Sequence, residues 1–377
     1  MELYAILKIV WWLLLGVLLV GLAVMVGMDM GIGAALRYFG RTDGERRAVL
    51  NMIGPHWDGN QVWFILGGGA VFAAWPTIYA TAFSGLYVVM LLLLWSMIIR
   101  PLGFEYRSKM PSATWRGVWD WGLFVSGAVP MVIFGAAMGN MLQGVPFHFN
   151  WNMESWYTGS FLGLLNPFAI LCGLMALALA LYQGAAMVMN RGEGGVWERA
   201  RRLGIWSGGI ALALFTIGGF WVSRLAGYAI TSGADPAGPA MPLHKTVVMV
   251  QGGWLHNFTA HPVLWLLPAL TYGAVLLGMA MLRSGRSHAG WWLGALGWIG
   301  TIGTVGAAMF PFMMPSSTNP SQSLTVWDAS SSRMTLMWML GWTVVFVPIV
   351  VTYTSWAFWV MRGKVTPEHV ENDDHAY

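Results

Sequence analysis

Long apolar segments recur along the whole chain and are separated by short polar ones. A membrane-spanning helix needs about 20 mostly apolar residues, and several segments meet that requirement. They lie near residues 7–28, 59–75, 79–99, 118–138, 158–188, 204–226, 261–282, 290–313 and 335–361. Pro76 lies between the second and third, which are the least separated, and can turn the chain there. The pattern predicts an all-α integral membrane protein, with one polytopic domain over residues 1–377 and about nine transmembrane helices.

Basic residues are distributed unevenly between the polar segments. Successive polar segments would lie alternately on the two sides of the membrane, and one set contains 16 of the 20 basic residues: Arg37, Arg41, Arg46, Arg47, Arg100, Arg107, Lys109, Arg116, Arg191, Arg199, Arg201, Arg202, Arg283, Arg286, Arg362 and Lys364. The other set contains Lys8, Arg224, Lys245 and Arg333. Because cytoplasmic loops are enriched in Lys and Arg, we predict an outside N-terminus and a cytoplasmic C-terminus.

Composition supports a lipid environment and excludes several kinds of site. The chain is 57% hydrophobic and 10% charged, whereas a soluble domain is about 25% charged. The single cysteine, Cys172, excludes an internal disulfide, a cysteine-ligated zinc site and an iron–sulfur cluster. The chain has no GxxxxGK[ST], GxGxxG or HExxH motif, so phosphate, dinucleotide and zinc-hydrolase sites have no support. We predict neither a metal site nor a nucleic-acid partner.

The most polar motif of the chain is GPHWDGNQVW, residues 54–63, which directly precedes an apolar run. Its carboxylate, Asp58, lies between His56 and the amides of Asn60 and Gln61. A carboxylate, an imidazole and an amide together suit proton relay at the mouth of a membrane span. Asp58 with Gln61 three residues later also resembles a capping box. Relay and capping both stay open, and the two roles are compatible.

Two further polar positions lie at the predicted inner ends of spans. Asp29 is in GMDMGIG, where glycines allow helices to approach closely, and its carboxylate either extends to the interface or has a function. RPLGFEYR, residues 100–107, closes the third span because Pro101 discourages a continuing helix. Arg100 and Glu105 there either anchor to lipid headgroups or line a path from the cytoplasm towards Asp58.

Histidines are poorly placed to hold a haem in this chain. His256 and His261 lie near the outer start of the seventh predicted span, while His56 lies at the opposite membrane face. Axial haem ligands in membranes are usually a pair of histidines at matching depth. We therefore predict no haem ligand in this chain.

These stretches resemble subunit II of the cytochrome bd-type quinol oxidases. The matching stretches span residues 11–332 in order and are WWLLLGVLLVG, MDMGIG, PHWDGNQVW, GGAVFAAWP, RPLGFEYRSK, MGNMLQGVPF, LLNPF, MFPFMMPSS and LTVWDASSS. The resemblance implies two four-helix bundles plus one peripheral helix, in the bacterial inner membrane. It also implies a complex that oxidises quinol and reduces dioxygen to water, with haem b and haem d held by subunit I. Small accessory subunits, and a structural quinone in this chain, are further implications.

Site residues follow from the same resemblance, position by position. The implied proton path comprises Asp58, Glu105, Arg100, His56, Asp29 and Tyr377, and Trp63 would mark the mouth of an oxygen path. The chain departs from the family pattern at Val26, where an acid is common, and at Glu105, where Asp is frequent. The first departure puts in doubt any role that needs two carboxylates on the first span.

A second class of function would use the same carboxylates. An independent proton-coupled transporter is expected to have discontinuous helices and an inverted repeat. Neither feature is evident in the sequence, so the oxidase subunit is the preferred interpretation.

Overall fold

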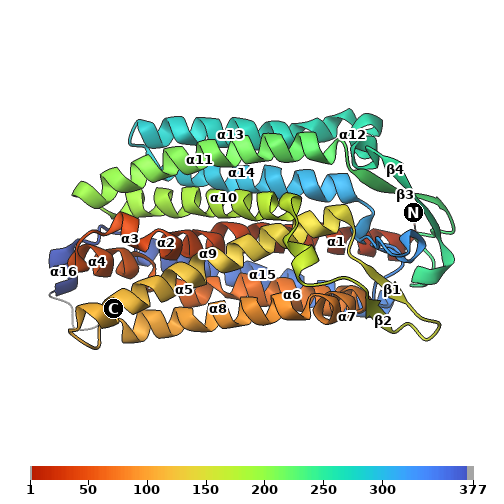
Figure 1. Ribbon diagram of the computed structural model, residues 1–377, viewed down its shortest axis with the longest axis horizontal. Helices are drawn as coiled ribbons and strands as arrows, with labels where there is room; N and C mark the ends of the chain where they lie inside the picture. The colour runs from red at the N-terminus through yellow and green to blue at the C-terminus, as the bar shows by residue number, and fades with distance from the viewer. Residues whose placement is uncertain (1, 372–377) are drawn as a thin grey trace.

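The computed structural model describes the fold of residues 2–371, so the predicted role of Tyr377 lies outside the described residues. Long helices run along one axis of the molecule (Figure 1). The α-helices are α1 (Leu3–Gly21), α2 (Gly27–Ala34), α3 (Leu36–Phe39), α4 (Asp43–Ile53), α5 (Trp57–Asn60), α6 (Val62–Ala74), α7 (Pro76–Gly85), α8 (Tyr87–Tyr106), α9 (Ala113–Gln143), α10 (Pro167–Arg191), α11 (Gly194–Val222), α12 (His256–Ala260), α13 (Leu266–Arg283), α14 (Ser287–Met309), α15 (Arg333–Val360) and α16 (Pro367–Glu371). A π-helical turn, η1 (Leu22–Val26), joins α1 to α2.

The nine-helix prediction is confirmed, with corrected bounds. Among the described residues, 8 helices are long and apolar enough to cross a membrane, and a bent pair, Trp57–Ala74 with Pro76–Gly85, is a ninth candidate. The predicted third span, 79–99, is wrong because Pro76 begins a separate helix at a bend of 117°. The third span is α8. The fifth span begins at Pro167 rather than at residue 158. Asn166 is the N-cap of α10, and its side chain accepts a hydrogen bond from the Ala169 amide.

Pro101 does not end the third span. Helix α8 continues through Pro101 to Tyr106, so RPLGFEYR forms the last turns of the span rather than its boundary. Proline removes one backbone donor and normally bends or breaks a helix. Membrane helices tolerate it where neighbouring helices satisfy the freed carbonyl.

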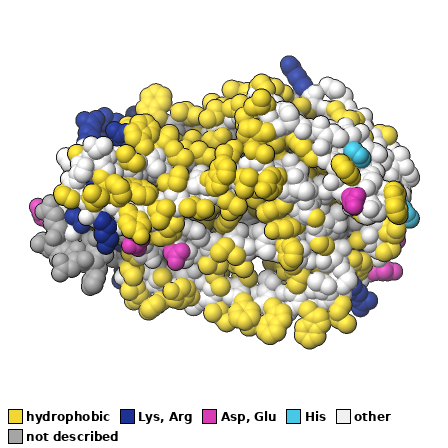
Figure 2. Space-filling model, turned by 60° about the horizontal axis from the view of Figure 1, so that its bottom comes forward, with side chains coloured by type: hydrophobic (Ala, Val, Ile, Leu, Met, Phe, Trp, Pro, Cys, Tyr) yellow, Lys and Arg dark blue, Asp and Glu magenta, His cyan; other side chains and the backbone are white. Residues whose placement is uncertain are grey.

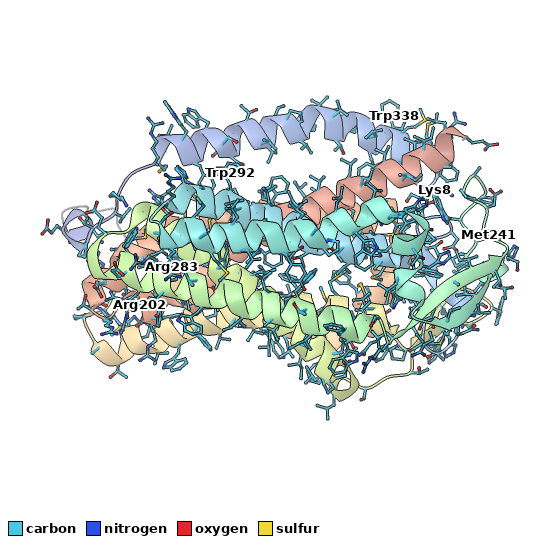
Figure 3. The ribbon with its side chains drawn as sticks, turned by 90° about the horizontal axis from the view of Figure 1, so that it is seen from above. Lys8, Arg202, Met241, Arg283, Trp292 and Trp338 are labelled. Carbon is cyan, nitrogen blue, oxygen red and sulfur yellow. The ribbon has the colours of Figure 1, made fainter. Side chains whose placement is uncertain are left out.

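The spans form two four-helix bundles and one peripheral helix. The first bundle contains α1–α2, α6, α8 and α9, and the second contains α10, α11, α13 and α14. Helix α10 joins them by packing against both α2 and α9. Helix α15 lies along the outside of the bundles (Figure 3), and Leu336 is its one buried residue. The predicted bundle architecture is confirmed.

Helix α2 is held unusually close to its neighbours through glycines. An added Cβ at Gly31 would lie 2.0 Å from the Ala180 carbonyl oxygen on α10. An added Cβ at Gly127 on α9 would lie 2.3 Å from the Met30 carbonyl oxygen on α2. Only a residue without a side chain permits such contacts between backbones. The glycines around Asp29 therefore fix the position of α2, as the sequence predicted.

The end opposite the basic loops is capped by short antiparallel strand pairs, which the sequence did not predict. They pair β1 (Phe147–Phe149) with β2 (Ser155–Tyr157), β3 (Ala226–Ser232) with β4 (Thr246–Gln251), and β5 (Phe312–Met314) with β6 (Leu324–Thr325). Lys8 holds this cap to α1: its buried Nζ donates to carbonyl oxygens of Pro236 (3.2 Å), Gly238 (3.0 Å) and Trp327 (2.6 Å). Three acceptors use all three ammonium protons.

The surface agrees with a membrane-embedded middle. Hydrophobic side chains cover the central part of the face in Figure 2, and Lys and Arg gather mainly at one end. That end carries the loops between α2 and α6, between α8 and α9, between α10 and α11, and between α13 and α14 (Figure 1). The basic segments predicted to share one side therefore do share one end of the molecule.

Replacing Gly31 by alanine is expected to destabilise the protein. The new methyl group would overlap the α10 backbone, and overpacking of this kind costs roughly 1–3 kcal/mol. Gly16→Ala is the matched control in the same span, because nothing lies within 4 Å of its added Cβ. Thermal unfolding in detergent should show a lower midpoint for Gly31→Ala alone, and equal midpoints would contradict the close packing.

Candidate functional site

A buried ion pair lies at the centre of the first bundle's basic end. Asp29 on α2 and Arg100 on α8 are 1% and 2% exposed, with 3.3 Å between Asp29 Oδ2 and Arg100 Nη2. Asn60, at the end of α5, donates from Nδ2 to the same Asp29 oxygen at 2.9 Å. Burying a single charge in an apolar medium is very unfavourable, and an opposite charge offsets much of that cost. Asp29 therefore does not extend to the interface.

Aromatic rings from the polar motif enclose this pair. The indole of Trp57 stacks on Phe104 with 5.0 Å between ring centroids and 1° between planes. The guanidinium carbon of Arg100 lies 5.8 Å from the centroid of the Trp57 ring. A cation over an indole face is attracted by the ring quadrupole. Trp57 thus links the GPHWDGNQVW motif to α8 at the level of the ion pair.

The pair leaves hydrogen-bonding capacity unused. Asp29 Oδ1, Asn60 Oδ1 and Arg100 Nη1 are buried and have no hydrogen-bond partner among the described residues. An unsatisfied buried polar group costs about 1–3 kcal/mol, so such atoms normally meet water or a polar ligand. The site is chemically suited to hold water molecules that could carry protons.

The π-helical turn η1 (Leu22–Val26) aims Asp29 into the site. An i→i+5 turn adds one residue to the helix and rotates everything after it, and such turns are frequent at functional sites. Val26, which replaces the acid common in the resembled family, is fully buried at its end. Just before the turn, the indole of Trp63 on α6 lies against Gly21, where an added Cβ would be 2.2 Å from Trp63 Cε3.

Asp58 is exposed and does not cap the second span. His56 is the N-cap residue of α5, and Asp58 lies within its single turn. Gln61 precedes α6 as N-cap but makes no capping bond through its side chain. The predicted capping box is therefore wrong, because the motif forms a separate one-turn helix before the span. Asp58 remains as an accessible carboxylate two residues before Asn60.

His56 is buried against the last turns of α15. Its ring stacks on Phe358 with 4.0 Å between centroids, and its Nε2 atom is buried with no hydrogen-bond partner among the described residues. Burial, with a smaller contribution from the Arg191 charge, lowers the pKa of His56 to about 4. His56 is therefore neutral near pH 7, and its neutral ring has one hydrogen-bond donor and one acceptor.

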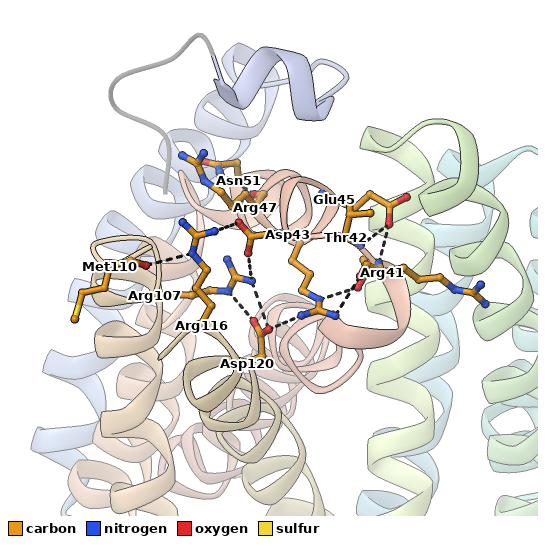
Figure 4. Close-up of polar contacts among 12 residues, drawn as sticks. Arg41, Thr42, Asp43, Glu45, Arg47, Asn51, Arg107, Met110, Arg116 and Asp120 are labelled. Atoms are coloured by element: carbon orange, nitrogen blue, oxygen red, sulfur yellow. Dashed lines mark hydrogen bonds and ion pairs between the residues drawn. The ribbon is translucent and has the colours of Figure 1, made fainter. Parts of the chain in front are cut away.

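A second charge network lies at the same end and was missed by the sequence analysis. Buried Asp120 on α9 accepts from Arg107 Nε at 2.6 Å and from Arg46 Nη1 at 2.9 Å. Asp43 bridges Arg107 (2.9 Å) and Arg116 (2.7 Å), as Figure 4 shows. An acid inside the apolar sequence GVWDWGL was the available signal. The network joins α4 and α9 to the C-terminal end of α8, beyond Arg100.

Glu105 is separate from both ion-pair groups. Its side chain is exposed on the last turn of α8, one residue from exposed Tyr106. The structure thus brings Asp29, Arg100 and His56 to one end with Asp58 and Glu105, but only Asp29 and Arg100 are in direct contact. His256 and His261 are exposed at the opposite end, around α12.

A bundle of apolar helices long enough to cross a membrane, with a buried carboxylate–guanidinium pair at one end, defines a class of protein: polytopic integral membrane proteins. The model of the family "Cytochrome bd terminal oxidase subunit II" matches residues 7–361. The chain therefore belongs to the cytochrome bd terminal oxidase subunit II family, and the resemblance found in the sequence is confirmed.

Individual relatives agree with the family assignment. The chain is 46% identical to cytochrome bd-I ubiquinol oxidase subunit 2 of Escherichia coli K12, over 99% of both chains. It is 28% identical to cytochrome bd ubiquinol oxidase subunit 2 of Bacillus subtilis, over 94% of this chain and 96% of that one. A chain of the bd oxidase structure from Geobacillus thermodenitrificans shares the fold, with a TM-score of 0.62 at 12% identity, covering 94% of this chain and 98% of that one.

The buried imidazole is expected to make stability depend on pH. The usual pKa of 6.5 falls to about 4 in the folded protein, so the unfolded chain binds a proton that the folded one excludes. The resulting contribution of His56 to the free energy of unfolding is complete above pH 6.5 and is lost as pH falls from 6.5 towards 4. His56→Phe keeps the stack on Phe358, and its unfolding midpoint should depend less on pH across that range. His256→Phe, at an exposed position, should retain the wild-type slope, and parallel curves for all three proteins would contradict the assignment.

Proposed function

We propose that this chain is the second subunit of a terminal oxidase that oxidises quinol and reduces dioxygen to water. The observation that carries the proposal is the family match over residues 7–361, together with near-complete alignment to a ubiquinol oxidase subunit. Haem b and haem d would be bound by subunit I and supply the electron transfer and oxygen reduction. This chain would support that subunit and supply access for protons and dioxygen.

Proton access is assigned to the basic end of the first bundle. Asp58 and Glu105 are exposed there in the isolated chain, and Asp58 shares the one-turn helix α5 with Asn60. Asn60 in turn bonds to the buried Asp29–Arg100 pair. In our proposal Asp58 takes up and releases protons, and the pair with its unsatisfied atoms orders the water beyond it. His56, the N-cap of the turn that contains Asp58, stays neutral near pH 7 in this proposal.

Dioxygen access is assigned to the seam between α1 and α6. Trp63 packs on Gly21 at the basic end of this seam, and Gly67, four residues later on the same face of α6, is buried with nothing within 4 Å of an added Cβ. Dioxygen is small and apolar, so a seam lined by indole and glycine would admit it and disfavour ions. This role for Trp63 is part of the proposal.

A structural quinone within this subunit is a further part of the proposal. An apolar cavity of about 440 Å³ lies between α10, α11, α13 and α14, and it has room for part of an isoprenoid tail. The Tyr272 and Thr216 hydroxyls at its wall already bond to each other at 2.7 Å. Small accessory subunits would have the exposed apolar surfaces of α8 and α15 available.

The independent transporter is less well supported. The bend of 117° between α6 and α7 is the kind of discontinuity that such proteins use. Against it, the relatives that align over almost the whole chain are named as oxidase subunits. Copurification of the chain with a haem-bearing partner, seen as a visible spectrum, would favour the oxidase, and a colourless self-sufficient carrier would favour the transporter.

Asp58→Asn should assemble with the partner but lose most quinol oxidase activity. Asparagine keeps the size and polarity of the side chain but cannot exchange a proton, and general acid–base groups contribute at least about a hundredfold to rates they control. Asp58→Glu should retain part of the turnover. Glu193→Gln, another exposed carboxylate at the basic end, is the control and should keep wild-type turnover. The measurement is oxygen consumption per haem; normal turnover in Asp58→Asn would leave Asp58 without a relay role.

The orientation in the inner membrane is also proposed from the charge distribution. The basic end faces the cytoplasm in our assignment, because 16 of 20 basic residues lie in the segments at that end. Reporter fusions after residues 110 and 195 should give cytoplasmic signals, and fusions after residues 150 and 240 should give outside signals. A reversed pattern would overturn the proposed direction of proton uptake.

A further inference from the structure

Some arginines at the basic end of the molecule are held in ion pairs and others are not. Arg46, Arg107 and Arg116 in the first bundle and Arg199 and Arg201 in the second have carboxylate partners. In the second bundle, three arginines, Arg202, Arg283 and Arg286, are exposed, and none has a side-chain hydrogen bond or an ion pair within the described part of the chain. Exposed guanidiniums without a protein partner are available to bind an external anion.

Packing brings these three arginines to a similar level beside the seam between α11 and α13. Helix α11 lies directly on α13, where an added Cβ at Gly204 would be 2.8 Å from Leu282 Cδ1. Arg202 and Arg283 are therefore close to the same level, and Figure 3 shows both at this end. The turn after α13 folds back on α11: Trp197 Cζ2 would lie 3.7 Å from a Cβ at Gly285, next to Arg286.

One acidic side chain partly balances the group. Glu198 forms an ion pair with Arg201 at 3.0 Å, and the Arg201 guanidinium lies 5.2 Å from the centroid of the Trp197 ring. Arg201 is thereby held at the seam with its charge mostly neutralised. The three remaining guanidiniums present planar forks of donors, which suit the oxygens of a phosphate group.

Apolar side chains continue from the arginines towards the middle of the membrane. Trp206 and Ile210 follow Arg202 by four and eight residues, so all three lie on one face of α11. The side chains of Trp206 and Ile210 are 73% and 51% exposed, and that of Leu276 on α13 is 55% exposed. A cation, then an indole, then aliphatic side chains reproduce the order of headgroup, interface and acyl chain in a lipid leaflet.

We propose that the seam of α11 with α13 and its following turn binds an anionic phospholipid, whose phosphate contacts Arg202, Arg283 and Arg286. The acyl chains would lie along Trp206 and Ile210. A free phosphate shares the headgroup chemistry, but the exposed apolar stripe beside the arginines favours the lipid. The proposal does not depend on the route of protons or on which side of the membrane this end faces.

The test uses the purified complex in a neutral detergent. Dihexanoyl-phosphatidylglycerol is titrated below its micelle concentration while the unfolding midpoint is recorded, with dihexanoyl-phosphatidylcholine and inorganic phosphate as separate titrations. Phosphatidylglycerol should raise the midpoint in a saturable way, and the zwitterionic lipid should not. An equal response to inorganic phosphate would overturn the lipid assignment in favour of a simple anion site, and no response to phosphatidylglycerol would overturn the site itself.

Single substitutions test which arginines bind the anionic lipid. Arg202→Gln and Arg283→Gln should each weaken the apparent affinity for phosphatidylglycerol about fivefold, the usual effect of one basic residue near an anionic surface. Glu198→Gln removes the balancing negative charge and should strengthen the affinity for phosphatidylglycerol. Arg224→Gln is the control: this exposed arginine lies at the opposite end of α11, just beyond its last residue, and should leave the affinity unchanged. Equal losses in Arg224→Gln and Arg202→Gln would show a dependence on net charge alone and contradict the proposal.

Discussion

The ion pair between Asp29 and Arg100 sets the requirements that the first bundle must meet. Two charges removed from water are tolerated only in a narrow geometry, since a displaced partner leaves the other charge buried and unpaired. The 3.3 Å separation therefore requires α2 and α8 to keep a fixed depth and rotation relative to each other. Helix α2 achieves this by backbone contact with α10 through Gly31. Helix α8 is held at its end by Arg107, which Asp120 and Asp43 bind.

The two ends of the molecule satisfy their charges by different means. At the basic end, carboxylates and guanidiniums form networks between helix ends (Figure 4). At the opposite end, Lys8 is surrounded by backbone carbonyls of the capping loops, and Lys245 pairs with Asp328 at 2.8 Å. The capping loops are thus tied to the first helix, while the basic end keeps accessible carboxylates and free arginines.

The candidate proton site combines a rigid inner part with an accessible outer part. Asp29, Arg100 and Asn60 form the inner part, where every polar side chain is buried. Asp58 forms the outer part on a one-turn helix that is separate from the span. The proposed oxidase function uses this division, because a proton must pass from an exposed carboxylate to water held within the bundle. In the proposed complex, the exposed Asp58 would also be available to the haem-bearing subunit.

The sequence by itself determined the nine-helix class, the segregation of basic residues to one end and the family. Each depends on composition over many residues, which a linear pattern records. It also singled out Asp29, Asp58 and Arg100, since ionisable residues in apolar surroundings are rare. It placed a turn at Pro76, but it did not determine that Asp29 pairs with Arg100, that Asp58 is exposed, or that α8 continues through Pro101. Those outcomes depend on contacts between helices far apart in the sequence, and only the packing of α2, α5 and α8 decided them.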